Sequence, residues 1–188
     1  AARHLLNMGA EVKVMALADT AEITGDALVN LEIWQKMGQR VYSLRHGDGI
    51  NIVRLALMNT DLIVDAIYGT GFKGRVAEKA GRIIEVLNGS GKPVVAVDIP
   101  SGLEADTGRV NGPCLRAAHT VTFGLPKLGL LLEPGAGYAG RLHVADISIP
   151  AGLVSKAAPR RYVITAGLVR EWLPSRPLES HKGDYGRV

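Results

Sequence analysis

The stretch DLIVDAIYGTGFKG, residues 61–74, passes from a nearly continuous apolar run into a glycine-rich loop. An apolar run of this length predicts a strand over residues 61–67 that is buried on both faces of a parallel sheet. An amphipathic helix is expected next, over residues 76–87, and the apolar run KPVVAVDI at 92–99 predicts a second strand. Two strands joined by a helix form a βαβ unit, so this stretch decides the fold class.

The same alternation of strand and helix runs through most of the chain. We therefore expect an α/β fold, a Rossmann-like three-layer domain around a mostly parallel, doubly wound sheet. In such sheets ligands bind outside the carboxyl ends of the strands, where the loops begin. The further strands are expected at residues 11–17, 40–44, 120–124 and 142–149, and the further helices at 25–37, 50–58 and 165–172.

The composition is that of a globular protein, and it excludes several classes. The 188 residues carry 22 Lys and Arg against 18 Asp and Glu, a net charge of +4, and the basic residues are scattered rather than clustered. We therefore expect no nucleic-acid partner. No apolar run approaches the ~18 residues of a membrane span, so no membrane partner is expected. Cys114, the one cysteine, cannot form an internal disulfide, and we expect it to be structural in a cytoplasmic protein.

A change in composition near Pro150 predicts a domain boundary. Prolines become frequent beyond it, and a helix at 165–172 is the regular element that we expect there. We therefore divide the chain into a first domain at 1–152 and, at 153–188, a linker with the beginning of a second α/β domain. Both chain ends fall inside predicted elements, a helix at 1–9 and a strand at 186–188. The first domain is accordingly expected to be truncated at its N-terminus.

Two aspartates at the ends of successive predicted strands are the strongest site candidates. Asp65 and Asp98 are separated by one βαβ unit, so both can face one crevice at the carboxyl edge of the sheet. Aspartates at strand ends also commonly hydrogen-bond the loop that follows them, and for either residue alone this structural role is the simpler interpretation. Because both are flanked by glycine-rich loops, we interpret the two together as functional.

The loop after Asp65 is suited to an anionic ligand. Gly69, Gly71 and Gly74 allow positive φ and let backbone N–H groups approach a ligand closely. The helix expected after the loop would add its N-terminal dipole, and Lys73 or Arg75 would add a positive charge. No acidic residue follows at the interval that a dinucleotide-binding fingerprint requires. The loop therefore predicts an anion without identifying it.

The sequence DIPSG at 98–102 adds oxygen ligands at the next strand end. Ser101 supplies a hydroxyl group, and Pro100 removes a backbone donor, which leaves nearby carbonyl groups free to face a cavity or a cation. Together with Asp65 these groups form an all-oxygen set, which suits a hard cation rather than zinc or copper. A simple serine turn explains the same residues equally well.

Four motifs, in this order, resemble the NAD(P)H-hydrate epimerase domain family. They are DLIVDAIYGTGFKG (61–74), VVAVDIPSGLEADTGRVNG (94–112), TVTFGLPKLGLLLEPGAGYAG (120–140) and VADISIP (144–150). The resemblance covers roughly residues 1–150. The tail ESHKGDYGRV (179–188) is similar to the opening of NAD(P)H-hydrate dehydratase domains. The two domains in this order are typical of bifunctional enzymes that repair hydrated nicotinamide nucleotides.

The resemblance implies an activity, a substrate and a cation. Epimerases of this family interconvert the R and S forms of hydrated NADH and NADPH at C6, so the substrate would be NADHX or NADPHX. Asp65 and Ser101 match residues that hold a potassium ion. Asp98 matches a substrate-binding residue and is the candidate catalytic general base or acid. The loop that matches the family's substrate-binding loop consists of Gly69, Thr70, Gly71, Phe72, Lys73, Gly74 and Arg75.

The resemblance also limits what is expected of this chain. The family's Asn-Asn-Gly-Gly-Asp loop, which shares in potassium and substrate binding, is not in the sequence, so we expect the chain by itself to turn over substrate poorly. The dehydratase domain, which would use ADP or ATP, is represented by its first few dozen residues, and no dehydratase activity is expected. Related domains tend to pair, which implies a homo-oligomer.

Two other functions remain open. Relatives of this fold serve as binding modules, but a scaffold would not require Asp65, Asp98 and Ser101 in their places. An ordinary nicotinamide-dependent oxidoreductase would require a dinucleotide fingerprint and a hydride-transfer site, and the sequence contains neither. Both alternatives are therefore less favoured than the epimerase.

Overall fold

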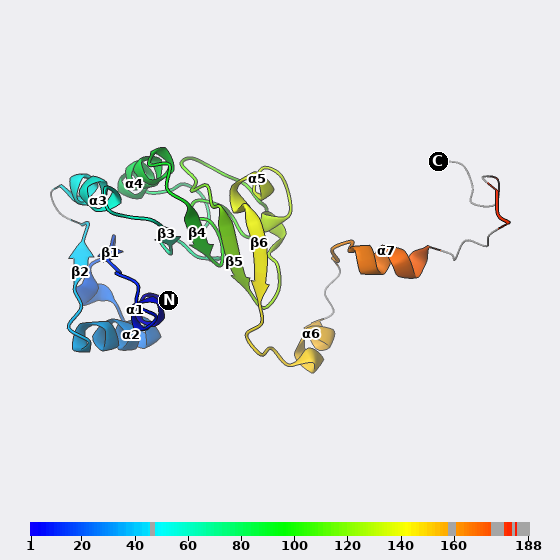
Figure 1. The fold of residues 1–188 in the computed structure, drawn as a ribbon, viewed down its shortest axis with the longest axis horizontal. Coiled ribbons are helices and arrows are strands. Elements are labelled where there is room, and N and C mark those ends of the chain that lie inside the picture. The colour runs from blue at the N-terminus through cyan, green and yellow to red at the C-terminus, as the bar shows by residue number, and fades with distance from the viewer. Residues whose placement is uncertain (46–47, 158–160, 174–178, 182, 184–188) are drawn as a thin grey trace. The chain divides into compact units, whose positions relative to one another are not determined.

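The computed structural model describes the chain except residues 46–47, 158–160, 174–178, 182 and 184–188 (Figure 1). Contacts divide the chain into two units, residues 1–147 and 148–188. The second unit contains α6 (Ala151–Ala157) and α7 (Ala166–Trp172). The helix predicted at 165–172 is thus confirmed, whereas the strand predicted at 186–188 lies outside the described residues.

The first unit alternates strand and helix as the sequence predicts, and most of its strands are shorter than expected (Figure 1). None of the helices in the described part of the chain is both long and apolar enough to cross a bilayer. The elements of this unit are α1 (Ala2–Asn7), β1 (Val14–Ala16), η1 (Thr20–Glu22), α2 (Gly25–Lys36), β2 (Val41–Ser43), α3 (Gly49–Leu57), β3 (Ile63–Asp65), α4 (Glu78–Gly89), β4 (Val94–Val97), β5 (His119–Phe123), η2 (Leu128–Leu130), α5 (Ala136–Ala139) and β6 (Arg141–Ala145).

All strand pairs of the first unit are parallel, as expected for βαβ connections. The strands β3, β4, β5 and β6 form a four-stranded sheet in that order, and β1 and β2 form a separate pair. The sequence predicts a single sheet, but among the described residues β1 and β3 are not hydrogen-bonded to each other. Alternation of strand and helix specifies parallel pairing of successive strands and does not specify whether two groups of strands meet. The Rossmann-like α/β class itself is confirmed.

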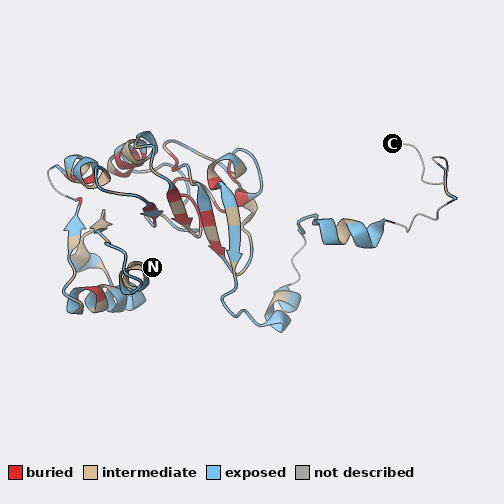
Figure 2. Ribbon diagram, in the orientation of Figure 1, coloured by how far each residue is buried: buried red, intermediate tan, exposed pale blue. Residues whose placement is uncertain are grey.

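The prediction that β3 is buried on both faces is wrong. Ile63 is buried, but Val64 beside it is 40% exposed. The next strand, β4, alternates in the same way, with Val94 and Ala96 buried and Val95 and Val97 partly exposed (Figure 2). One face of both strands is covered because Ile84 of α4 packs against Ile63 and Val94. An apolar run alone does not reveal that the opposite face is open.

Asn88 in the last turn of α4 holds the segment that leads into β5. Its Nδ2 donates to the carbonyl oxygen of Cys114 at 2.9 Å, and its Oδ1 accepts from the N–H of Arg116 at 2.9 Å. Leu115 lies between these two residues, is fully buried, and donates its N–H to the carbonyl of Ser101 at 2.9 Å. The side chain of one helical residue therefore fixes a segment that contacts the predicted site.

Replacing Asn88 by alanine is expected to lower the free energy of unfolding by about 1–2 kcal/mol, because two hydrogen bonds worth about 1 kcal/mol each are lost. The midpoint of urea unfolding measures the change. Glu85→Ala, at an exposed position of the same helix, is the matched control and should stay within about 0.5 kcal/mol of wild type. Equal stabilities of the two variants would contradict the role of Asn88.

Candidate active site

The strand β4 ends in a tight turn that places Asp98 in a strained backbone conformation. Asp98 has a φ of 69°, and the N–H of Ile99 donates to the carbonyl of Val97 at 2.9 Å, which closes a γ-turn around Asp98. At the end of β5 the residue with the same φ of 69° is Gly124. Glycine adopts this conformation freely, whereas another residue there costs of order 1–3 kcal/mol. An aspartate in this place therefore points to a function rather than to stability.

The Asp98 carboxylate lies against the end of β5 and is held by three donors. Its Oδ1 accepts from Thr122 Oγ1 at 2.9 Å, from the N–H of Phe123 at 3.1 Å and from Lys127 Nζ at 2.5 Å. Partial burial, the largest single effect, raises the pKa of Asp98. The hydrogen bonds and the charge of Lys127 together outweigh it and hold the pKa below its ordinary value. Asp98 is therefore ionised at neutral pH and can accept a proton.

Lys127 completes this group and is not among the site residues that the sequence predicts. Its Nζ also donates to Thr122 Oγ1 at 3.0 Å and to the carbonyl of Phe123 at 2.9 Å. The side chains of Lys127 and Asp98 are 22% and 21% exposed, so the ion pair is shielded but still accessible to a ligand. The signal that could have found Lys127 is its place in the glycine-rich motif at 120–140, just past the end of a strand.

Asp65, at the end of β3, lies against Ser101. Asp65 Oδ2 accepts from the N–H of Ser101 at 2.8 Å, and Asp65 Oδ1 accepts from Ser101 Oγ at 2.6 Å. Both residues are almost completely buried. Burial raises the pKa of Asp65, and hydrogen bonds from Ser101 and from the N–H of Ile67 oppose that rise. The structure thus brings together the two residues that the sequence predicts as ligands of a cation.

The surroundings of Asp65 fit a cation. Among the described residues no basic side chain forms an ion pair with its carboxylate, so a negative charge would be buried without a compensating positive charge. Such a charge is costly unless it is paired or binds a metal. The side-chain ligands available, the Asp65 carboxylate and the Ser101 hydroxyl, are both oxygens, the type that hard cations prefer.

The loop of residues 69–75, which we call the glycine loop, follows β3 and is mostly exposed. The N–H of Phe72 donates to the carbonyl of Gly69 at 3.0 Å, and the Phe72 ring packs on Tyr68 with 4.8 Å between the ring centroids. Gly74 has a φ of 85°, in the region that favours glycine. Gly69 and Gly71, for which the sequence also predicts a turn with positive φ, do not adopt it. The loop is therefore exposed as expected, but the prediction of positive φ is confirmed for Gly74 alone.

Two features of this loop differ from the expectation. The helix α4 begins at Glu78, so residues 76–77 separate the glycine loop from it, and the acidic Glu78 lies in its first turn. That negative charge makes the helix N-terminus less suited to a second anion. Lys73 pairs with Asp106 at 3.3 Å on the surface, which leaves Arg75 as the expected positive charge without an ion pair among the described residues. Backbone N–H groups, rather than the helix dipole, are what the loop offers to an anion.

The predicted residues form two groups at the carboxyl edge of the sheet. Tyr68 N–H donates to Ser101 Oγ at 2.9 Å, which joins the start of the glycine loop to the pair formed by Asp65 and Ser101. Asp98 belongs to the other group, with Lys127. No described hydrogen bond or ion pair joins Asp65 to Asp98. The expectation of adjacent strand ends is confirmed, but the two carboxylates have different partners.

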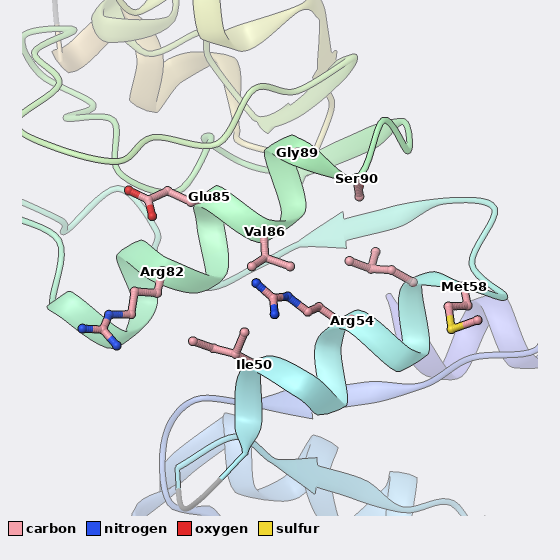
Figure 3. A pocket seen from close by; sticks show the side chains of 9 residues that line it. Ile50, Arg54, Met58, Arg82, Glu85, Val86, Gly89 and Ser90 are labelled. Atoms are coloured by element: carbon pink, nitrogen blue, oxygen red, sulfur yellow. The ribbon is translucent and has the colours of Figure 1, made fainter.

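A groove of about 700 Å³ lies elsewhere, between α3 and α4 (Figure 3). Arg54 points between the two helices there, beside Ile50 and Val86. None of the site residues predicted from the sequence lines this groove. We place the candidate active site at the strand ends because the buried carboxylate, the ion pair and the strained backbone occur there.

Comparison with known families gives one match over most of the chain. A family model described as YjeF-related protein N-terminus matches residues 1–129. Among solved structures, the crystal structure of the yeast protein Ynu0 (YNL200c) is similar, with a TM-score of 0.68 and 25% sequence identity. That match covers 87% of this chain and 66% of the yeast chain.

Curated relatives extend over the whole chain. The bifunctional NAD(P)H-hydrate repair enzyme Nnr of Moorella thermoacetica is 54% identical over 187 residues, which cover 100% of this chain and 35% of that protein. The enzyme of the same name in Escherichia coli is 34% identical over 188 residues, again 35% of its length. The NAD(P)H-hydrate epimerase of Rhodopirellula baltica is 35% identical over 153 residues, which cover 81% of this chain and 61% of that protein. The chain thus spans about a third of the length of the bifunctional relatives.

Proposed function

This chain belongs to the family of YjeF-related protein N-termini, and we propose on that basis that it epimerises hydrated NAD(P)H as part of a longer repair enzyme. The reaction interconverts the R and S forms of NADHX and NADPHX. The name of the R. baltica relative gives this activity for that protein, and the names of the longer relatives give repair of NAD(P)H hydrates.

The observation that carries the proposal is the ion pair of Asp98 and Lys127. It lies at a carboxyl strand end, where ligands of doubly wound sheets bind. Asp98 keeps this place in a positive-φ backbone conformation that glycine adopts more readily. A module that served as a passive scaffold would have no need of a strained, ionised aspartate held beside a lysine ammonium group.

In the proposed reaction Asp98 and Lys127 move the protons that inversion at C6 requires. C6 bears a hydroxyl group and is bonded to the ring nitrogen, so the C–O bond can break as the nitrogen lone pair forms a C=N bond. The departing oxygen takes a proton and leaves as water. Water then adds to the opposite face and returns a proton to the protein, with no net oxidation. Lys127 offers the proton and Asp98 the accepting oxygen, and the two are in hydrogen-bond contact.

Potassium is the cation that we propose for Asp65 and Ser101. Its positive charge would compensate the buried Asp65 carboxylate, and the oxygen ligands suit its chemistry. Because Ser101 Oγ accepts from the N–H of Tyr68, an ordered Ser101 also fixes the start of the glycine loop. The backbone N–H groups of that loop would hold phosphate oxygens of the substrate.

Replacing potassium by tetramethylammonium at equal ionic strength is expected to lower the melting temperature of the full-length protein. A ligand of the folded state at 100 times its dissociation constant stabilises by about 2.7 kcal/mol, and the bulky cation cannot enter the site. Asp65→Asn, which removes the charge, should abolish the difference between the two salts. Identical melting curves of the wild-type protein in both salts would contradict potassium binding at Asp65 and Ser101.

The rest of the bifunctional enzyme is part of the proposal. We assign residues 1–152 to the epimerase domain and residues 153–188 to a linker and the beginning of an NAD(P)H-hydrate dehydratase domain that uses ADP or ATP. This follows from the relatives named as bifunctional repair enzymes, which align with the whole of this chain over 35% of their own length. Pairing of two copies through this domain is proposed from the family resemblance alone.

A mixture of R and S NADPHX tests the proposed function. A separately supplied dehydratase that is specific for the S form should consume that form and leave the R form. Addition of the full-length protein, with its own dehydratase inactivated, should then bring the reaction to completion. If the amount of R form left unconsumed is the same with the protein as without it, the proposal is contradicted.

A further inference from the structure

Glu104 reaches from the segment after β4 to the glycine loop. Its Oε1 accepts from the N–H of Gly74 at 3.0 Å and from Asn111 Nδ2 at 3.3 Å, and its Oε2 accepts from Thr107 Oγ1 at 2.7 Å. The hydrogen bond from Gly74 is the largest of the effects that lower the pKa of Glu104. The carboxylate is therefore ionised at neutral pH and remains an acceptor for all three donors.

The backbone that carries Glu104 is firmly held. Leu103 and Val110 form an antiparallel bridge, and the N–H of Glu104 donates to the carbonyl of Arg109 at 3.1 Å within this hairpin. Leu103 is fully buried in a cluster of core residues that includes Ile99. The Glu104 side chain thus extends from a backbone segment that is fixed by hydrogen bonds and by packing in the core.

The far end of the glycine loop has weaker attachments of its own. The ion pair between Lys73 and Asp106 is exposed on both sides, 72% for each side chain. Exposed pairs of this kind contribute little. The Phe72 N–H bonds within the loop and does not attach it to another segment. The hydrogen bond from Gly74 to Glu104 is therefore the strongest described attachment of this end of the loop.

We infer that Glu104 is a positioning residue, which holds the glycine loop through Gly74 so that the loop N–H groups other than those of Phe72 and Gly74 face the substrate. The inference rests on the proposed function. It also excludes the Gly74 end of the loop from the anion site. The N–H of Gly74 already donates to Glu104, and the negative charge of Glu104 repels a phosphate group there. The phosphate oxygens then accept hydrogen bonds from the backbone N–H groups that precede Gly74 in the loop, other than that of Phe72, and from Arg75.

The inference is tested with Glu104→Ala and Glu104→Gln in the full-length protein. Alanine removes the acceptor, whereas glutamine keeps an oxygen that can accept from Gly74 N–H. We expect Glu104→Ala to raise KM for NADPHX about tenfold, since a hydrogen bond to a charged group is lost, with kcat within a few-fold of wild type. Glu104→Gln should restore KM to within a few-fold of wild type. Asp61→Asn, at an exposed position just before β3, is the control and should match wild type.

A second readout separates failure of this inference from failure of the proposed function. Amide hydrogen exchange at Gly74 should be faster in Glu104→Ala than in wild type and near wild type in Glu104→Gln. If the wild-type protein does not epimerise NADPHX, the proposed function fails while the exchange still tests the attachment. A wild-type KM in Glu104→Ala, or a KM in Glu104→Gln as high as in Glu104→Ala, would overturn the positioning role.

Discussion

Asp98→Asn is expected to slow the conversion of R-NADPHX to S-NADPHX by about 10²–10⁴-fold, the contribution typical of positioned proton transfer. Asparagine has nearly the shape of aspartate and tolerates the positive φ that this position requires. It can still accept from the donors that now hold Asp98, but it cannot take up a proton. The substitution therefore removes the proton acceptor and adds no backbone strain to that already present at Asp98.

The control for Asp98→Asn is the same change at an exposed carboxylate. Asp61→Asn lies on the surface and should leave the rate within a few-fold of wild type. The melting temperatures of both variants should stay close to that of wild type. A rate for Asp98→Asn within a few-fold of the control would show that Asp98 is not the proton-transfer group.

Asp65→Ala is expected to lower the free energy of unfolding by about 2–5 kcal/mol. Two opposing effects are involved. Removal of the buried carboxylate stabilises the protein, because its desolvation no longer costs free energy. The N–H and hydroxyl groups of Ser101 and the N–H of Ile67 lose their acceptor, which destabilises it. An unsatisfied buried donor costs about 1–3 kcal/mol, so the loss of several should outweigh the relief. Denaturant unfolding measures the difference.

Asp65→Asn separates the two roles of this residue. Its amide oxygen still accepts from Ser101, so its stability without potassium should lie closer to wild type than that of Asp65→Ala. Asp61→Ala, at an exposed position just before β3, is the control for changes near this strand and should be close to neutral. If Asp65→Ala were as stable as Asp61→Ala, the hydrogen bonds to Ser101 would not be what anchors these strand ends.

The sequence was sufficient to place Asp65 and Asp98 at adjacent strand ends. Apolar periodicity indicates where a strand stops, and parallel βαβ units bring successive carboxyl ends to one edge. The glycine loop was found for the same reason, because glycines that permit positive φ follow directly after the strand. These predictions depend on short-range pattern and chain order, which a sequence displays.

The partners of these residues could not be predicted in that way. Lys127 is 29 residues from Asp98, and Glu104 is 30 residues from Gly74, so both contacts depend on how separate loops pack. The exposed Val64 illustrates the same limit, since an apolar side chain on an uncovered sheet face looks like a buried one in sequence. What could not be predicted is therefore the environment of each side chain rather than its place along the chain.

Separated R-NADPHX shows whether the full-length protein is an epimerase. The R form is incubated with the protein in potassium chloride without ADP or ATP, and the two epimers are quantified over time by chromatography. We expect S-NADPHX to appear at a rate proportional to protein concentration until the equilibrium ratio is reached. Appearance of S-NADPHX no faster than in buffer, with a folded protein present, would contradict it.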